Sequence, residues 1–372
     1  MSDNDFSKEQ NPWYLRDGKD NDVLISTRVR YARNLANFPF VPNFRGDNKE
    51  RVQVLVFDAF SHFEKLDDYV FVDTSLLDSD GMKILAERGM LKLTKTPEGK
   101  IIPFGSGLII HSGGNVSCSI NCTDHLHIAS LRSGLDCRTC FDECKKIDSD
   151  LQQYLQFAAS CDFGYLTTSL LNAGSGIKFS AIIHIPSIVR TGKIRGFVDY
   201  LREKGLKILP AFPSPPALEA ALGCYFIIST VSAQSGTEID QLSSFESACR
   251  YIIDSERKIL DELADNKRTI NRNTVIRAYS LAKFSTLVSM NEAIELISDI
   301  QFGVRLGLIS GIDNSSLCGI LYRIQDGHLN YLMKSASFNF EKDIEDSQRL
   351  KIDRLRAIIL QETFDKILLG NL

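Results

Sequence analysis

The chain has 372 residues, of which 44% are hydrophobic and 24% are charged, and its formal net charge is −4. This length exceeds that of one ordinary domain, and the hydrophobic share is large enough to bury a core in each of two domains. The small negative charge excludes a general nucleic-acid binder, which relies on a broad basic surface, so any site for phosphate has to be local.

The N-terminus is polar, and no apolar run approaches the roughly 20 residues that a membrane helix needs. We therefore expect no signal peptide, no membrane contact and a cytoplasmic location. The nine cysteines are expected to be mostly reduced thiols rather than a disulfide framework.

The first informative stretch, residues 26–40, carries Arg28, Arg30 and Arg33. In an extended segment Arg28 and Arg30 project to the same face, where two guanidinium groups can converge on one anionic group such as a polyphosphate. Arg33 follows at a point where we expect the chain to turn helical. The alternative is the polar face of an ordinary surface strand, and this stretch alone does not decide between the two.

Beyond this stretch, periodicity and turn signals predict helices and strands. Apolar residues recur at helical spacing over 49–66, and Gly113–Gly114 marks a turn between two strands. The elements expected up to residue 121 are helices at 49–66 and 81–89 and strands at 69–73, 100–110 and 115–121.

Three cysteines, Cys137, Cys140 and Cys144, follow one another at i, i+3 and i+7. This spacing predicts the buried face of a helix, expected over 139–159, because free cysteine behaves as a small hydrophobic residue. The competing interpretation is a zinc or iron–sulfur site that also uses Cys122, His125 or His127. The helical spacing favours the core, and we expect no bound metal.

Between residues 164 and 231 strand signals dominate. A glycine-rich loop at 174–176 would let backbone N–H groups approach a ligand, although closely spaced glycines more often only form a turn. Short turns join several neighbouring strands, so we predict an α+β domain over 1–244, with a mixed or antiparallel sheet flanked by helices. Its elements here are strands at 164–169, 179–185, 206–212 and 224–231 and a helix at 188–204.

Strand signals stop after about residue 238. The remaining periodicity predicts an all-α domain over 245–372, which we expect to mediate dimerisation or regulation. One of its helices opens with the capping-box pattern Ser289-x-x-Glu292. The expected helices are 246–263, 273–287, 291–308 and 340–368.

Segments 26–40, 120–128 and 164–186 together resemble, in order and spacing, the ATP:guanidino phosphotransferases, and specifically the bacterial protein-arginine kinases of the McsB type. The resemblance implies a guanidino-kinase catalytic domain that uses ATP with Mg²⁺. Transfer of a phosphoryl group to a guanidinium needs a carboxylate to orient the acceptor and take its proton, and cations along the triphosphate. In this chain the resemblance assigns nucleotide phosphates to Arg28 and Arg30.

Other aligned positions depart from the family's pattern. Cys122 and Thr123 stand where the family has two adjacent glutamates, and Ser169 stands where it has a reactive cysteine. Thr237 replaces a further glutamate. The positions of three nucleotide-binding arginines are occupied by His127, Lys178 and Ser232.

These replacements predict a catalytically impaired pseudokinase, since losing one preorganised transition-state contact commonly costs about 100-fold or more in rate. We expect a binding or regulatory role in protein quality control, with ATP binding weak or lost. Two alternatives stay open. One is an active protein-arginine kinase that uses the replaced residues, and the other is a structural metal-binding protein built around Cys122, His125, Cys137 and Cys140.

Near the C-terminus, Asp353, Arg356 and Ala357 match part of the Arg-Asp-x-x-Arg-Ala motif of protein-arginine kinases. The resemblance implies a phosphoarginine-binding pocket at Asp353 and Arg356, whereas the plainer interpretation is an ion pair within one helix. It further implies a zinc-binding activator protein and a Clp-type unfoldase as partners, and we expect a homodimer.

Overall fold

The computed structural model describes residues 12–215, 217–266 and 268–370. Contacts divide these residues into two compact units. The first comprises residues 12–16, 26–180 and 229–247, and the second comprises the remaining described residues. Each unit is made of several segments of the chain, so this division does not test the predicted domain boundary between residues 244 and 245, which stays a prediction.

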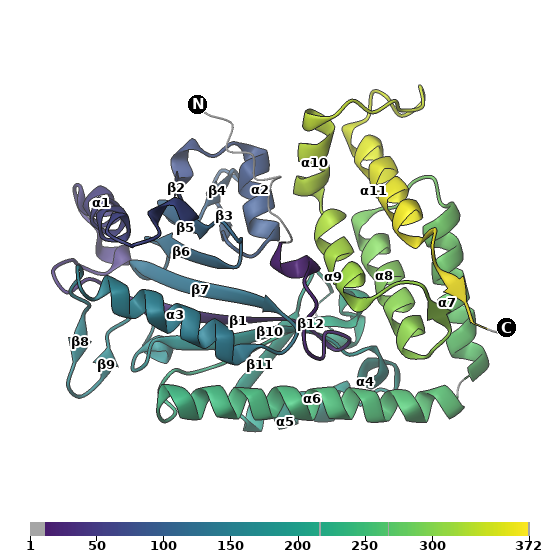
Figure 1. Cartoon of the computed structure of the whole chain (residues 1–372), viewed down its shortest axis with the longest axis horizontal. Coiled ribbons are helices and arrows are strands. Elements are labelled where there is room, and N and C mark those ends of the chain that lie inside the picture. The colour runs from purple at the N-terminus through teal and green to yellow at the C-terminus, as the bar shows by residue number, and fades with distance from the viewer. Residues whose placement is uncertain (1–11, 216, 267, 371–372) are drawn as a thin grey trace. The chain divides into compact units, whose positions relative to one another are not determined.

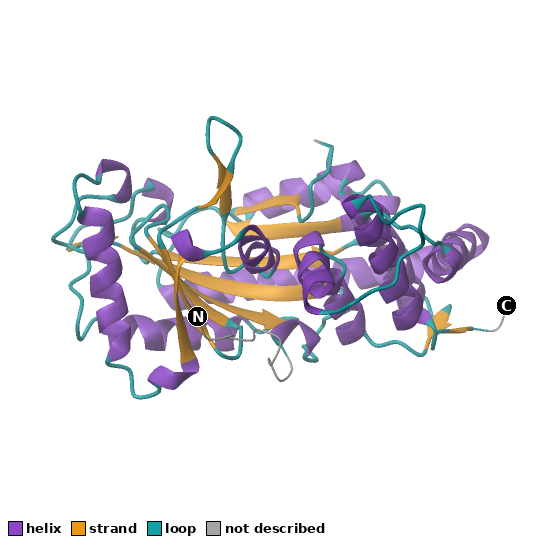
Figure 2. Cartoon of the chain, turned by 90° about the horizontal axis from the view of Figure 1, so that it is seen from above, coloured by secondary structure: helices purple, strands orange, loops and turns teal. Residues whose placement is uncertain are grey.

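The main sheet has eight strands in the order β11-β12-β10-β1-β7-β6-β5-β2 (Figures 1 and 2). The run β1–β7–β6–β5–β2 is antiparallel throughout, which confirms the predicted α+β fold class. The strands are β1 (Leu24–Arg33), β2 (Tyr69–Asp73), β5 (Gly107–His111), β6 (Val116–Ile120), β7 (Leu126–Ser133), β10 (Ile177–His184), β11 (Leu206–Pro210) and β12 (Tyr225–Thr230).

Most strand predictions are confirmed to within a few residues, and three are corrected. The run 100–110 is broken into the short β4 (Ile101–Pro103) and β5, and only β9 (Gly164–Tyr165) forms within 164–169. Strand β7 was not predicted, because it lies in the middle of the sheet and seven of its eight residues are buried, so it lacks the alternation of a half-buried strand. The other short strands are β3 (Leu93–Lys95), β8 (Ala159–Ser160), β13 (Ile309–Ser310) and β14 (Leu368–Leu369).

Helix α3 (Cys137–Leu151) covers one face of the sheet in the first unit (Figure 1). Cys137, Cys140 and Cys144 are fully buried, and the thiols of Cys140 and Cys144 point at the carbonyl oxygens of Thr27 and Val29 in β1. The predicted cysteine face is confirmed as core. The helix starts two residues before the predicted range and ends eight residues before its end.

The other helices of the first unit are α1 (Asn48–Ser61) and α2 (Ser79–Glu87), both close to their predicted ranges. Leu85 of α2, together with Met90 and Leu91, packs on β5 in a small separate core. Helix α1 buries Val52 and Val56, two of the residues whose spacing predicted it.

The second unit is mainly helical, and its core centres on α8, where Ile297, Ile300 and Phe302 are buried. Among the described helices none is both long and apolar enough to cross a membrane. The helices that complete the chain are α4 (Pro186–Arg190), α5 (Ile194–Glu203), α6 (Glu238–Asn266), α7 (Arg268–Phe284), α8 (Met290–Arg305), α9 (Asn314–Arg323), α10 (Asp326–Ser335) and α11 (Gln348–Phe364).

Three predictions in this part of the chain are corrected. The helix expected at 188–204 is two helices, because Gly192 adopts a left-handed φ of 71° between them. The helix expected at 340–368 is the shorter α11. Helices α9 and α10 were not predicted, since each has only ten residues and offers few repeats of a helical pattern.

The third arginine of the 26–40 stretch does not start a helix, because Arg33 is the last residue of β1. It makes a bidentate ion pair with Asp148 of α3, with Nε–Oδ1 at 2.8 Å and Nη2–Oδ2 at 3.1 Å. Its Nη1 donates to the carbonyl oxygen of Ser175, and its guanidinium lies 3.6 Å from the ring centre of Tyr165. Arg33 therefore fixes α3 and the glycine-rich loop to the sheet.

The glycine-rich loop is held by the same arginine. Gly176 has a φ of 69°, and a Cβ there would lie 2.4 Å from Nη1 of Arg33 and 2.6 Å from the carbonyl oxygen of Ala32. Glycine is required at this position by the close approach of β1, so the loop serves packing first.

We predict that Asp148→Ala lowers the free energy of unfolding by about 3–5 kcal/mol, because it leaves the buried Arg33 without its counter-ion. Thermal and urea unfolding of the full chain would measure this loss. The matched control is Asp142→Ala on the same helix, where an exposed pair with Arg138 is removed, and the expected change is about 0–1 kcal/mol. Equal effects of the two substitutions would contradict this role of the ion pair.

Candidate phosphate-binding site

Strand register places Arg28, Arg30 and His127 on one face of the sheet. In the antiparallel pair β1–β7, Arg28 lies opposite Leu131, Arg30 opposite Ala129 and Ala32 opposite His127. Residues directly opposite share a face, and so do alternate residues of one strand. The other face carries Tyr31 and Arg33, which contact α3. Arg28 and Arg30 thus share a face, as predicted, on the side of the sheet away from α3.

Among the described residues, no hydrogen-bond acceptor is found for the Nε atom of either arginine. The Nε atoms of Arg28 and Arg30 are buried without a hydrogen-bond partner, and no described carboxylate forms an ion pair with either. Burial, followed by the charge of Arg30, lowers the pKa of Arg28 to about 10, and burial also lowers the pKa of Arg30. The nearby charge of Asp124 opposes this shift only at Arg30. Two adjacent, desolvated cations without a directly paired carboxylate are unfavourable, so this face fits a polyanion.

Asp124 is completely buried and connects the segments at one end of this face. Its Oδ1 accepts from the side-chain amide of Asn34 at 2.8 Å and from the backbone N–H of Thr168 at 2.7 Å. Its Oδ2 lies 3.2 Å from Nε2 of His127. Burial alone would raise the pKa of Asp124, but the hydrogen bonds from His127, Thr168 and Asn34 lower it to about 2.

These contacts fix the tautomer of His127. A carboxylate only accepts hydrogen bonds, so Nε2 carries the proton and Nδ1 keeps its lone pair. No donor to Nδ1 occurs among the described residues. Burial and then the charge of Arg30 lower the pKa of His127 to about 4, so the ring is neutral at neutral pH.

His125 has a structural role. Its Nδ1 accepts from the backbone N–H of Leu35 and its Nε2 donates to the carbonyl oxygen of Pro39, both at 2.9 Å, while Phe44 stacks on the ring. Neither nitrogen is left for a metal. No described group of three or more histidine, cysteine or acidic residues is arranged to hold a metal ion.

Cys122 and Thr123 follow the Asn121 turn that leads from β6 to Asp124. The thiol of Cys122 donates to the carbonyl oxygen of Phe104 at 2.9 Å, and burial raises its pKa to about 11 despite the nearby charge of Arg30. Thr123 is exposed. This part of the site therefore offers a neutral thiol and a hydroxyl.

The remaining predicted positions lie in segments held by local hydrogen bonds. The backbone carbonyl of Ser169 accepts from Thr167, Ser232 Oγ accepts from the N–H of Gln234, and Thr237 bonds Asp240 at the start of α6. Lys178 is half-buried on β10. Thr168, the residue before Ser169, donates its backbone N–H to Asp124. This hydrogen bond connects the Ser169 segment to the face that carries Arg28 and Arg30.

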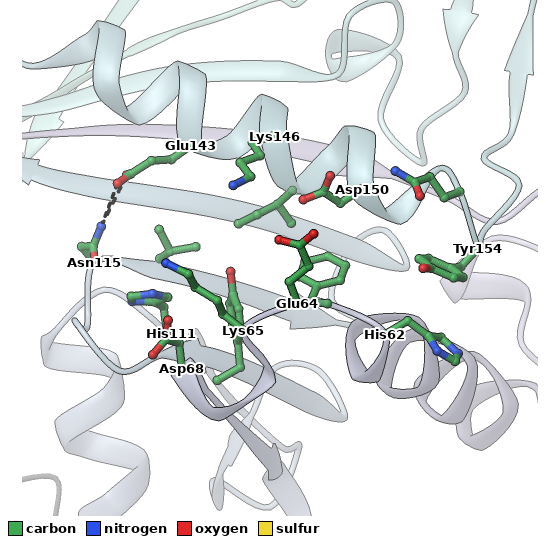
Figure 3. A pocket seen from close by; sticks show the side chains of 15 residues that line it. His62, Glu64, Lys65, Asp68, His111, Asn115, Glu143, Lys146, Asp150 and Tyr154 are labelled. Carbon is green, nitrogen blue, oxygen red and sulfur yellow. Dashed lines mark hydrogen bonds between the residues drawn. The ribbon is translucent and has the colours of Figure 1, made fainter.

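A cavity of about 580 Å³ lies elsewhere in the first unit (Figure 3). Residues of both charges line it, among them Glu64, Lys65, Lys146 and Asp150, and Asn115 donates to Glu143 at its edge. None of the predicted site residues lines this cavity. Sequence patterns did not predict this cavity, because its walls come from three separate segments.

Comparison with known proteins identifies the family. The model of the ATP:guanido phosphotransferase C-terminal catalytic domain matches residues 51–259, more than half of the chain. The chain belongs to the ATP:guanido phosphotransferase family. The model of the protein-arginine kinase McsB C-terminal domain matches residues 269–368, so this family member is of the McsB type.

Relatives named protein-arginine kinase match over nearly the whole chain. That of Halothermothrix orenii is 26% identical over 353 residues, which cover 93% of this chain and 97% of the relative. That of Desulforamulus reducens is 28% identical over 345 residues, which cover 92% of this chain and 93% of the relative.

Two solved guanidino kinases share the fold. The duplicated taurocyamine kinase from Schistosoma mansoni with bound transition state analog components has a TM-score of 0.58 and 16% identity, and the match covers 78% of this chain and 40% of that one. Lombricine kinase has a TM-score of 0.55 and 15% identity, with 68% of this chain and 70% of that one covered.

In the second unit of this guanidino-kinase homologue, Arg356 is 1% exposed and fully engaged. Its Nε donates to the carbonyl oxygen of Ile324, its Nη1 to Val288 and to Asp353, and its Nη2 to Asp326. The intrahelical ion pair with Asp353 is therefore present within a larger network. Phosphoarginine binding at Asp353 and Arg356 stays a prediction.

The depressed pKa of His127 makes stability depend on pH. The unfolded chain binds a proton at His127 below about pH 6.5, whereas the folded chain does so only below about pH 4. Between these values the unfolded state holds more protons, so stability falls as the pH falls through this window.

We predict that His127→Gln removes this part of the pH dependence, since glutamine cannot be protonated. Melting temperatures from pH 7.5 to about pH 4.5 should fall less steeply for the variant than for the wild type. The control His62→Gln changes an exposed histidine and should keep the wild-type slope. Parallel curves for wild type and His127→Gln would refute the assignment of a neutral, buried His127.

Proposed function

We propose that this protein-arginine-kinase homologue is catalytically impaired, binds a nucleoside triphosphate on the Arg28–Arg30 face, and acts as a binding or regulatory protein in protein quality control. The cytoplasm is the proposed location. The observation that supports the proposal is a contrast within the site. Arg28 and Arg30, the cations that would bind the triphosphate, are present, whereas Cys122 and Thr123 stand at the positions aligned with the carboxylates that orient the acceptor.

The missing half concerns the guanidinium acceptor. An acceptor with a pKa above about 12 has to be oriented and deprotonated by a carboxylate. The aligned residues are Cys122, whose raised pKa keeps the thiol neutral, and the exposed Thr123. Asp124 is close, but three hydrogen bonds already engage its oxygens and lower its pKa to about 2, which makes it a weak base.

The retained half concerns the triphosphate. The orphaned Nε atoms of Arg28 and Arg30 support binding of phosphate oxygens, because a bound polyanion supplies acceptors that the described residues do not. Mg²⁺ carried with the nucleotide would supply further positive charge. With His127 neutral, the face has fewer cations than the family pattern, so we expect weak affinity.

The alternatives have less support. An active kinase would need another acceptor carboxylate, but Glu238 is paired with Lys145 at 3.6 Å, and Asp162 lies in the turn between β8 and β9. A metal-binding protein built around Cys122, His125, Cys137 and Cys140 is disfavoured, since His125 has both nitrogens bonded and Cys140 points into the core.

The partners are proposed from the resemblance alone. They are a zinc-binding activator protein, a Clp-type unfoldase and a second copy of the chain. For the homodimer, the residues to examine are the exposed apolar residues of α7, Ile270, Leu281 and Phe284. A monomeric mass in light scattering at micromolar concentration would remove the homodimer.

We predict that incubation with Mg-ATP and an arginine-rich protein such as casein yields no phosphoarginine above background. Mass spectrometry under non-acidic conditions, which preserve the P–N bond, is the measurement, and an active protein-arginine kinase is the positive control. Phosphoarginine that disappears in an Arg28→Ala variant would show that this chain is an active kinase and would overturn the proposal. Free arginine and creatine serve as additional acceptors.

A further inference from the structure

The contact between Asp124 and His127 has a structural role, but the acceptor nitrogen Nδ1 of His127 has none in a site that only binds nucleotide. We infer that this face hydrolyses nucleoside triphosphates, with His127 Nδ1 as the proton acceptor for the attacking water and Asp124 as its positioning residue. The inference rests on the proposed function, because it requires the triphosphate to bind at Arg28 and Arg30.

The geometry of the pair is that of an oriented base. Asp124 is immobilised by Asn34 and by the backbone of Thr168, and it engages Nε2 of His127 at 3.2 Å. The ring is 7% exposed, and its Nδ1 lone pair has no donor among the described residues. A carboxylate that fixes the tautomer of a histidine and stabilises its protonated form is the arrangement by which histidine becomes an effective general base.

The location of the pair fits attack on a phosphoryl group. His127 lies directly across from Ala32, and Arg30 occupies the next position of β1 on the same face. Diagonal neighbours of this kind are about 7–8 Å apart, a distance that an arginine side chain and a phosphate span together. The charge of Arg30, and last that of Arg28, contributes to the lowered pKa of His127, as expected for cations on the same face of the sheet.

Water is the nucleophile that the remaining groups favour. The site has lost the carboxylates that orient a guanidinium, whereas water needs only a proton acceptor within hydrogen-bond reach. Neutral Cys122 donates its S–H to the carbonyl oxygen of Phe104 and does not compete as a base.

The reaction balances with water and the triphosphate as the only reactants. The water oxygen forms a bond to the terminal phosphorus as the bond from that phosphorus to the bridging oxygen breaks, and the electron pair of the broken bond leaves on the nucleoside diphosphate. The water proton passes to Nδ1 of His127 and then to solvent, and the terminal phosphoryl group leaves as inorganic phosphate. Arg28 and Arg30 offset the negative charge of the phosphates.

We expect bound triphosphate to raise the pKa of His127 as well. Without nucleotide, burial and the positive charge of Arg30 hold the pKa of His127 near 4. Phosphate oxygens on Arg30 and Arg28 oppose that charge and raise the pKa towards the operating pH, where a general base is most effective.

The test is phosphate release from Mg-ATP by the full chain in water enriched in heavy oxygen. We expect inorganic phosphate that carries one heavy-oxygen atom from the solvent.

His127→Gln keeps an amide donor for Asp124 but removes the Nδ1 lone pair, and it should lower the rate about 100-fold. Asp124→Asn should lower it as well, because an amide donor to Nε2 forces the proton onto Nδ1. The matched control His62→Gln should keep the wild-type rate.

Nucleotide binding gives a readout that is independent of turnover. The rise in melting temperature with Mg-ATP should survive in His127→Gln and disappear in Arg28→Ala with Arg30→Ala. Nucleotide-dependent stabilisation without phosphate release, or release that is unchanged in His127→Gln, would overturn the hydrolysis inference and leave the proposed function standing. Phosphoarginine formation would instead overturn the proposed function.

Discussion

The alternation of side chains along β1 is the constraint on which the described architecture of the first unit depends. Odd-numbered residues from Val29 to Arg33 face α3, where Tyr31 contacts Phe141 and Arg33 pairs with Asp148. Even-numbered Arg28 and Arg30 therefore face the other way, where no described residue accepts a hydrogen bond from their Nε atoms. One strand thus separates an arginine that stabilises the fold from the two arginines that we propose bind a triphosphate.

The second determinant is Asp124, which connects three segments that are distant in sequence. Asn34 follows β1, Thr168 follows β9, and His127 lies in β7, and all three donate to this carboxylate. A buried carboxylate with these partners stays ionised and is costly to remove. The described residues thus build a face with two cations, and the two residues before Asp124, Cys122 and Thr123, are not carboxylates.

The sequence predicted what depends on local spacing. The i, i+3, i+7 cysteines identified the buried face of α3, and alternate arginines identified a shared face of β1. Local spacing did not reveal β7, which is buried on both faces, or the partner of Arg33, which lies 115 residues away. The tautomer of His127 follows from Asp124 only when the strands are paired.

The same limit applies to the C-terminal motif. The spacing of Asp353 and Arg356 predicted an ion pair, and that pair is present. The other acceptors of Arg356 are the backbone oxygens of Val288 and Ile324 and the carboxylate of Asp326, which come from segments 30 to 68 residues distant. A motif of six residues gives no information about such partners, because tertiary packing supplies them.

The destination of the terminal phosphoryl group is the central question for this protein. Phosphorus NMR of the full chain with Mg-ATP and an arginine-rich acceptor follows that group directly, since ATP, inorganic phosphate and an N-phosphorylated guanidinium give separate signals. Loss of the γ-phosphate signal with matching growth of inorganic phosphate, and no signal from a P–N bond, is the predicted result. A growing signal from the P–N species would contradict the account.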